Sequence, residues 1–436
     1  MIELVPLCSP IPASAALNCR VPGSKSYTIR ALLIAALTPG VVQIENPLES
    51  DDTLAMKHCL NVLGIPVAQV DNAWFVEGSV HQVEPNRQYE LNANLSAASL
   101  RFLTALSTIL PGEQVLFGEH GLNQRPVKDL VDSLRRVGAY IIDHDREGYP
   151  PLRVLSDHLT PEDNVIRVSG KTSSQYASAL MMIAPELVSR SGLDIVIELI
   201  DEPISRPYLE MTRSIMAAFG VTVEAPNDRQ YRIRQGQHYQ PITYAVETDA
   251  SSMAYPLAIA ALSQSTLTIE NVKPDSVQAD MELIEILKQM GNMMTFADGT
   301  LTIQGKGVQP LDYNMENCPD QAQTVAVLAA FAKGASRLSG LQSLRVKETD
   351  RLAAVTSELR KMGITVDETS DALTVYGGNP QAAQIATYGD HRMAMAFAVA
   401  GSVLPGVKIE HPEVSAKTYP GFWDDLKKLG IGVVPY

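Results

Sequence analysis

Six helix-like segments that each end at a glycine recur along the 436 residues of the chain, and this repetition limits the folds open to it. The glycines are Gly64, Gly138, Gly220, Gly291, Gly363 and Gly430. Their spacing of 67 to 82 residues is too long for a solenoid repeat, but it suits a supersecondary unit of two helices and several strands. A chain of this length also exceeds one ordinary core, so we expect two domains.

Each of the six units begins with a loop of small or polar residues that leads into an apolar helix. These first loops are residues 23–26, 94–97, 170–175, 249–252, 318–321 and 389–392. A strand candidate, a second loop and an amphipathic helix follow, the last with apolar residues at helical spacing, as at Leu352, Val355 and Leu359. The second loops are residues 49–53, 124–126, 205–208, 278–280, 347–351 and 417–420. The chemically richest residues thus precede predicted helix starts in unit after unit.

Helix starts of this kind favour anionic ligands, because free backbone N–H groups and the positive end of the helix dipole point there. Basic side chains add formal charge at or near these loops. They are Lys25, Arg30, Arg101, Arg125, Arg206, Arg345, Lys347, Arg351, Arg392 and Lys417. If the six units are alike, the loops gather at the ends of the units and can hold several phosphate or carboxylate groups at once.

Six units divide naturally into three and three. Residues 22–246 are predicted to form one domain, and residues 1–21 together with 247–436 the other, because the chain can cross back near residues 244–247, just before the fourth unit. The basic residues then come from both domains. This division predicts a cleft that closes on its ligand.

Composition narrows the class of protein. The net charge of −14 argues against nucleic acid or an anionic membrane as the main partner, since both need a basic face. No window approaches the roughly 18 consecutive apolar residues of a membrane span, and prolines interrupt residues 1–16, so we expect no membrane helix and no signal peptide. The cysteines show no CxxC spacing, which predicts a reduced, cytoplasmic compartment and no metal site. They are Cys8, Cys19, Cys59 and Cys318.

Several of these loops also fit ordinary helix starts. Thr349 could cap the helix that follows it, and Asp350 suits the positive end of that helix dipole. Ser173 and Asp320 are plausible caps as well, and a histidine at the position of His391 is more often structural than catalytic. Residues 23–26 lack the GxxxxGK[ST] spacing of a nucleotide phosphate loop, so a nucleoside triphosphate is not expected. The recurrence of such loops at equivalent repeat positions favours a functional role.

Seven motifs, in order, resemble the enolpyruvyl transferase family over essentially the whole chain. They are PGSKSYTIRALL from Pro22, RPVKDLVDSLRRVGA from Arg125, SSQ from Ser173, SRPYLEMT from Ser205, RVKETDRL from Arg345, DHRMAMAF from Asp390 and KTYPGF from Lys417. The resemblance implies an α/β fold of two inside-out domains, each of three βαβαββ repeats, with the active site in the interdomain cleft. Since such a cleft needs no partner chain, we expect a monomer.

Within the family, the shikimate branch is the better match. The UDP-N-acetylglucosamine branch typically has a reactive cysteine where this chain has His120, and its first loop tends to read Lys-Asn where this chain has Lys25 and Ser26. The implied reaction transfers the enolpyruvyl group of phosphoenolpyruvate to the 5-hydroxyl of shikimate-3-phosphate and releases phosphate. It is a step of aromatic amino acid biosynthesis that uses neither a metal nor an organic cofactor.

Position by position, the resemblance also implies roles for single residues. Shikimate-3-phosphate would be held by Lys25, Ser26, Arg30, Ser173, Ser174, Gln175, Ser205, Tyr208, Asp320 and Lys347. Phosphoenolpyruvate would be held by Lys25, Arg125, Arg351, Arg392 and Lys417. Asp320 would accept the proton of the 5-hydroxyl, while Glu348 and Lys25 would move protons at C3 and at the leaving phosphate.

Residues 94–99 depart from the family pattern. The family has Gly-Asn-Ala/Ser-Gly-Thr before the arginine that corresponds to Arg101. This chain has Leu95, Ala97 and Ala98 in place of the asparagine, the second glycine and the threonine, so two polar contacts are lost and a methyl group is added. We expect an active enzyme with weaker phosphoenolpyruvate affinity and reduced glyphosate sensitivity. The alternatives are a paralogue that binds a phosphorylated ring without enolpyruvyl transfer, and a transferase for another acceptor.

Overall fold

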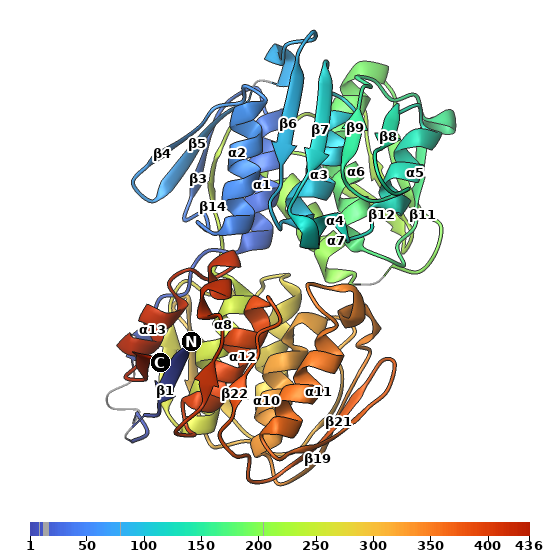
Figure 1. Cartoon of the computed structure of the whole chain (residues 1–436). Helices are drawn as coiled ribbons and strands as arrows, with labels where there is room; N and C mark the ends of the chain where they lie inside the picture. Colours follow the sequence, from blue (N-terminus) through green and yellow to red (C-terminus); the bar gives the residue numbers. More distant parts are fainter. Residues whose placement is uncertain (8, 12–16, 79, 204) are drawn as a thin grey trace. The chain divides into compact units, whose positions relative to one another are not determined.

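The computed structural model of the chain describes residues 1–7, 9–11, 17–78, 80–203 and 205–436, and Cys8 lies outside the described residues. The chain divides into two units. The central unit is Gly23–Val246, and the terminal unit is Met1–Pro22 together with Glu247–Tyr436. Each unit contains three four-stranded sheets of the same topology (Figure 1).

In every sheet the first two strands are parallel and the other two join antiparallel. In the central unit the orders are β14 (Thr243–Ala245), β3 (Gly40–Glu45), β5 (Ala73–Gly78), β4 (Val67–Val70); β6 (Gln88–Asn92), β7 (Glu113–Phe117), β9 (Leu152–Val154), β8 (Ile141–Asp143); and β10 (Val165–Val168), β11 (Ile195–Leu199), β13 (Gln230–Ile233), β12 (Val223–Asn227). β14 comes from the end of this unit and completes the sheet at its beginning.

The terminal unit has the same three sheets, two of them completed by strands from the start of the chain. The orders are β2 (Leu17–Cys19), β15 (Thr266–Ile269), β17 (Thr300–Gln304), β16 (Met293–Ala297); β18 (Asp312–Asn314), β19 (Gly334–Ser339), β21 (Leu373–Gly377), β20 (Thr365–Glu368); and β22 (Gln384–Ile385), β23 (Lys408–Ile409), β1 (Ile2–Val5), β24 (Gly432–Pro435). Because β1 and β2 are strands of these sheets, the N-terminal segment belongs to the terminal unit.

The first helix of each repeat is buried in the middle of its unit. These helices are α1 (Lys25–Leu37), α3 (Ala97–Ser107) and α6 (Ser174–Ser191) in the central unit, and α8 (Ala250–Ser263), α10 (Ala322–Phe331) and α12 (His391–Gly401) in the terminal unit. The three helices of each unit pack against one another, and their residues are apolar on nearly all sides. A helix that is apolar all round needs burial on every side. The helices therefore form the core and the sheets lie outside, which confirms the inside-out α/β fold.

The second helix of each repeat is amphipathic and packs on the outside of the buried three. These helices are α2 (Asp51–Val62), α5 (Lys128–Arg136), α7 (Pro207–Ala218), α9 (Glu282–Gln289), α11 (Arg351–Lys361) and α13 (Phe422–Lys428). All six repeat glycines follow these helices in the left-handed backbone region, with φ from +78° to +103°, as helix C-terminal caps require. Within the described residues, no helix is long and apolar enough to cross a membrane.

Three further glycines occupy one repeat position, at the end of the third strand of a sheet. They are Gly78, Gly305 and Gly377. A Cβ atom at each would overlap the backbone carbonyl oxygen of a residue near the C-terminal end of the buried helix beneath, which is Thr38, Ala260 and Ala329 respectively. Only glycine lets the sheet approach the core helix so closely.

We expect Gly377→Ala to destabilise the protein by about 1–3 kcal/mol, because the added methyl group must push β21 away from α10. The neighbouring Gly378 is the matched control, since a Cβ there meets nothing within 4 Å. Gly378→Ala should change stability by no more than about 0.5 kcal/mol. Urea unfolding of both variants checks this, and equal unfolding midpoints would contradict the close approach.

Candidate active site

In the terminal unit the structure brings six predicted site residues into one network, which we call the Asp320 cluster. Its members are Asp320, Lys347, Glu348, Arg351, Arg392 and Lys417. Each lies at or next to the start of a helix or in a short helical turn. Asp320 is in η5 (Pro319–Gln321) before α10, Lys347 and Glu348 lie between η6 (Gln342–Val346) and α11, and Lys417 ends η7 (Pro412–Lys417). Arg351 and Arg392 open α11 and α12.

Arg351 is the centre of this cluster. Its side chain is only 2% exposed and contacts three carboxylates. Nη1 lies 2.9 Å from Asp320 Oδ1, Nη2 lies 2.8 Å from Glu348 Oε2, and Nε lies 2.6 Å from Asp390 Oδ2. A buried guanidinium is stable only when its N–H groups are satisfied by such partners. Arg351 therefore fixes the relative positions of Asp320 and Glu348.

Arg392 and the two lysines complete the network. Arg392 donates to the Asp320 carbonyl oxygen at 3.1 Å, and its Nη2 lies 3.3 Å from Asp320 Oδ2. Lys347 Nζ is 3.3 Å from Asp320 Oδ1, and Lys417 Nζ is 2.9 Å from Glu348 Oε1. Each of the two predicted catalytic carboxylates thus contacts more than one cation.

The electrostatics of Asp320 follow from these contacts. Burial disfavours its charged form, but Lys347, Arg392 and Arg351 outweigh burial and hold the pKa of Asp320 well below its usual range. Burial likewise disfavours the charged form of Arg351, but Asp390, Glu348 and Asp320 outweigh it and raise the pKa of that guanidinium. Both groups are therefore ionised at neutral pH.

Two buried carboxylates that received no role in the sequence analysis support the cluster. Asp390 is fully buried, pairs with Arg351 and accepts a hydrogen bond from the Arg392 backbone N–H at 2.9 Å. Asp280 accepts a hydrogen bond from Ser251, whose hydroxyl accepts from Arg392 Nη2 at 3.2 Å. Burial, countered by Arg392, raises the pKa of Asp280. Both aspartates lie in the repeat loops, and that position in the sequence could have indicated that they contribute to the site.

In the central unit Lys25 and Arg30 lie on α1. Lys25 Nζ is 3.3 Å from Asp52 Oδ2 at the start of α2. Arg30 is 2% exposed, and its guanidinium donates to Thr212 Oγ1 at 2.8 Å. Arg30 also donates to the backbone oxygens of Ser26 and Tyr208, at 3.1 and 3.4 Å. Arg30 thus links the backbones of Ser26 and Tyr208, two other residues predicted to bind the substrate.

A second group in the central unit surrounds the start of α6. Arg101 donates to Gln175 Oε1 at 2.7 Å and to Ser173 Oγ at 3.3 Å, and its guanidinium lies over the Tyr176 ring. Arg101 also donates to the carbonyl oxygen of Pro126 at 3.1 Å, next to the partly buried Arg125. Ser173 caps the helix, as the structural alternative predicted, while its hydroxyl also accepts from Arg101.

Some sequence expectations at these loops were wrong. The cap of α11 is Asp350, not Thr349: its carboxylate accepts from the Ala353 backbone N–H at 3.1 Å. Asp320 caps no helix and faces the cations instead. Two of the predicted cations pair elsewhere: Arg206 with the exposed Glu202, and Arg345 with Asp350 and Glu368. In the structure, carboxylates of the protein itself are the partners of these two arginines.

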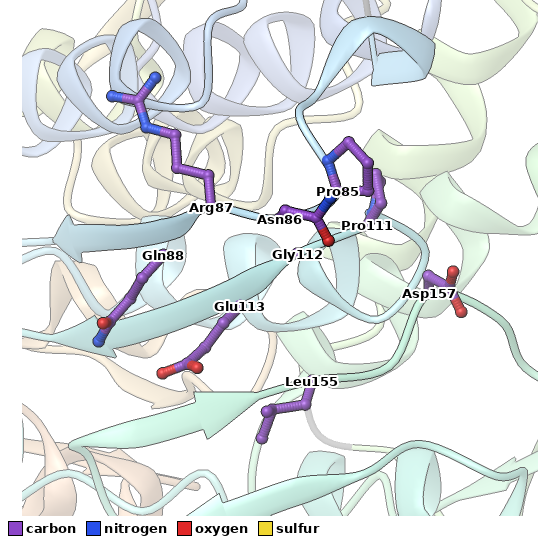
Figure 2. A pocket seen from close by; sticks show the side chains of 9 residues that line it. All are labelled: Pro85, Asn86, Arg87, Gln88, Pro111, Gly112, Glu113, Leu155 and Asp157. Atoms are coloured by element: carbon purple, nitrogen blue, oxygen red, sulfur yellow. The ribbon is translucent and has the colours of Figure 1, made fainter.

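A depression of about 520 Å³ on the central unit has none of the predicted site residues in its lining (Figure 2). It is lined by Pro85, Asn86, Arg87, Gln88, Pro111, Gly112, Glu113, Leu155 and Asp157. In Figure 2 the side chains of Arg87 and Glu113 point away from one another, and Glu113 pairs with Arg153 at 2.7 Å. The lining has no convergent set of catalytic groups.

His391 provides a pH test of the cluster. It is fully buried, its Nδ1 lies 3.5 Å from Asp390 Oδ1, and neither ring nitrogen has a hydrogen-bond partner among the described residues. Burial lowers its pKa well below the usual value; Glu348 opposes this shift, while Lys417, Arg392 and Arg351 add to it. The unfolded chain therefore binds a proton near pH 6.5 that the folded protein refuses.

Stability should consequently fall as the pH drops below about 6.5, by up to about 1.4 kcal/mol per pH unit from this one group. His391→Gln should remove that slope whatever its effect on stability at neutral pH. The matched control, His58→Gln, changes an exposed histidine on α2 and should keep the slope. Denaturant unfolding between pH 5 and 8 measures it, and parallel curves for wild type and His391→Gln would refute the assignment.

Comparisons with known proteins identify the family of the chain. Residues 12–426 match the family model of EPSP synthase (3-phosphoshikimate 1-carboxyvinyltransferase). Relatives named 3-phosphoshikimate 1-carboxyvinyltransferase include those of Sulfurovum sp. (strain NBC37-1), 38% identical over 94% of this chain and 95% of theirs, and of Burkholderia multivorans, 39% identical over 96% and 97%.

Solved structures give the same fold. EPSP synthase from Acinetobacter baumannii superposes with a TM-score of 0.80 over all of both chains at 23% identity. The enolpyruvyl transferase NikO from Streptomyces tendae superposes with a TM-score of 0.76 at 17% identity, over 99% of this chain and 98% of the other. With the near full-length match to the family model and to relatives at 38–39% identity, the chain belongs to the EPSP synthase (3-phosphoshikimate 1-carboxyvinyltransferase) family.

Proposed function

We propose that this protein transfers the enolpyruvyl group of phosphoenolpyruvate to the 5-hydroxyl of shikimate-3-phosphate and releases phosphate. The observation that carries the proposal is the Asp320 cluster: in a chain of this family, one buried arginine holds both carboxylates to which we assign acid–base chemistry. We also propose that the protein works as a monomer in the cytoplasm. The chemistry forms one C–O bond, breaks another and transfers protons without a net change of oxidation state, steps that acidic and basic side chains can catalyse.

Phosphoenolpyruvate is proposed to bind Lys25, Arg125, Arg351, Arg392 and Lys417. The guanidinium and ammonium groups of Arg392 and Lys417 contact Asp320 and Glu348, which are anions of the kind that a phosphate or carboxylate can replace. An arriving phosphate would compete for these N–H donors. As the cations turn toward it, the carboxylates lose part of the charge that holds their protons off and become better bases.

Shikimate-3-phosphate is proposed to bind Lys25, Ser26, Arg30, Ser173, Ser174, Gln175, Ser205, Tyr208, Asp320 and Lys347. Neutral hydroxyl and amide groups at the starts of α1 and α6 suit the ring hydroxyls and the phosphate, which accept hydrogen bonds. Arg30 also supports this site, because its guanidinium donates to the backbone oxygens of Ser26 and Tyr208 and so fixes their positions.

The proposed chemistry has two steps. Asp320 takes the proton of the 5-hydroxyl as that oxygen bonds to C2 of phosphoenolpyruvate, and Glu348 delivers a proton to C3, which gives a tetrahedral ketal. The C2–O bond to phosphate then breaks while Glu348 takes a proton back from C3 and Lys25 donates a proton to the leaving phosphate. The proton that Asp320 took from the 5-hydroxyl returns through solvent to Lys25 after product release. Glu348 lies between Arg351 and Lys417, so cations stabilise its ionised form between the two proton transfers.

We expect purified protein given both substrates to release phosphate steadily, and Asp320→Asn to lower kcat by about 10²- to 10⁴-fold, the usual contribution of a general base. Asp424→Asn is the matched control, since Asp424 is exposed and forms an ion pair with Lys427, away from the Asp320 cluster in sequence. No phosphate release by wild type that still binds shikimate-3-phosphate would replace this proposal by the binding-only paralogue.

Reduced glyphosate sensitivity is the finer part of the proposal, and it rests on the start of α3. Ala97 is the first helical residue after the cap Ser96, whose hydroxyl donates to Ser99 Oγ at 2.8 Å. Ser99 Oγ donates to the backbone oxygen of Asp52 at 3.0 Å, and the Asp52 carboxylate is the partner of Lys25. The departing loop is thus linked to a proposed phosphoenolpyruvate ligand, and glyphosate competes for the same space.

Ala97→Gly should therefore lower the inhibition constant of glyphosate and the KM for phosphoenolpyruvate, each by about tenfold, the effect of roughly 1–2 kcal/mol from one relieved methyl group. Ala98→Gly is the matched control: it places the same glycine one residue later in the first turn and should shift both constants less than threefold. Steady-state inhibition assays decide this. A wild-type inhibition constant already as low as that of sensitive family members would contradict it.

A further inference from the structure

A buried glutamate on α11 lies outside every role assigned so far. Glu358 is fully buried, and its carboxylate accepts three hydrogen bonds. Tyr388 Oη donates to Oε1 at 2.6 Å, while the Ala386 backbone N–H and Lys361 Nζ donate to Oε2 at 3.2 and 2.8 Å. Two of these three donors belong to the segment 386–390, which leads directly into α12.

This segment has an unusual backbone. Tyr388 has φ +55° and the next residue, Gly389, has φ +67°. A bulky L-residue in the left-handed region costs roughly 1–2 kcal/mol, so surrounding contacts must hold it. The Asp390 backbone N–H then donates to the Thr387 carbonyl at 2.8 Å, and α12 begins at His391. The turn therefore sets where Asp390 and Arg392 point.

The same helix face holds both ends of this turn. Arg351 and Glu358 are seven residues apart on α11, which is about two helical turns, so their side chains project from the same face. Arg351 contacts Asp390 at the end of the segment, and Glu358 contacts Ala386 and Tyr388 at its beginning. One rigid helix thus fixes the segment at two points.

We propose that Glu358 and Tyr388 are positioning residues that hold the 386–390 turn so that Arg392 is aimed at the phosphoenolpyruvate phosphate. The inference rests on the proposed function of Arg392. Burial and Glu358 raise the pKa of Tyr388 to about 12, so its hydroxyl keeps its proton and donates at working pH. Glu358 and Tyr388 touch no reacting group themselves.

Tyr388→Phe is the first test, because it removes one hydroxyl from a side chain that is 45% exposed and leaves the ring. We expect the KM for phosphoenolpyruvate to rise about three- to tenfold, the loss of one partly buried hydrogen bond to a carboxylate. The affinity for shikimate-3-phosphate should change less than twofold. Lys361→Met is the matched control, since Lys361 contacts the same glutamate but not the turn, and its KM should stay within twofold.

A double variant separates positioning from general destabilisation. If Tyr388 acts through Arg392, Tyr388→Phe should raise the KM for phosphoenolpyruvate less than twofold when it is made in an Arg392→Lys background. If the double variant instead raises this KM by the product of the two single effects, the inference is wrong. An equal loss of affinity for both substrates, together with a lower melting temperature, would also overturn it. Glu358→Gln should match or exceed the effect of Tyr388→Phe, since it also disturbs the contact to Ala386.

The single Arg392→Lys variant distinguishes a failure of the positioning role from a failure of the proposed role of Arg392. If it raises the KM for phosphoenolpyruvate while Tyr388→Phe does not, the positioning role is wrong and the proposed function stands. If neither variant alters that KM, the proposed role of Arg392 fails first, and the positioning role fails with it.

Discussion

The ionised guanidinium of Arg351 is the group on which the terminal unit's chemistry depends. It is buried, so it must be paired, and its partners Asp320, Glu348 and Asp390 come from three different repeats or loops. Because one planar group fixes all three, the two carboxylates proposed for acid–base work cannot move independently. Lys347, Arg392 and Arg351 keep Asp320 ionised by surrounding it with positive charge, and Lys417 pairs with Glu348. The ion pairs that hold these side chains in place are therefore also the contacts that determine the electrostatics of the cluster.

The fold explains why so many charged groups meet in one place. Each repeat buries its first helix among two others, and side chains in the loop before that helix, such as Ser173 and Asp390, accept from backbone N–H groups at its start. Three equivalent repeats therefore present several helix starts to the same region of each unit. A protein with a net charge of −14 can in this way concentrate cations locally against its overall field.

The proposed ligands and the buried carboxylates that support them differ in what they act on. Arg392, a proposed ligand, is itself buried and contacts Asp320 and Ser251 through its guanidinium, whereas the buried Asp390, Asp280 and Glu358 act on other side chains or on the backbone. Buried carboxylates of this kind have no solvent to replace a lost partner, so each constrains the geometry of the loop above it.

The amino-acid sequence by itself determined the six repeats, the buried and amphipathic helices and the glycines that end them, because helical periodicity and caps are local properties of the chain. It also placed Asp320, Glu348 and the cations at helix starts. What only the tertiary structure decided is which charges meet. Arg206 and Arg345 look like Arg351 in sequence, yet the first two pair near the surface while Arg351 is buried among three carboxylates, two of them from distant segments. That choice depends on contacts across 31 and 39 residues of chain, which no local pattern encodes.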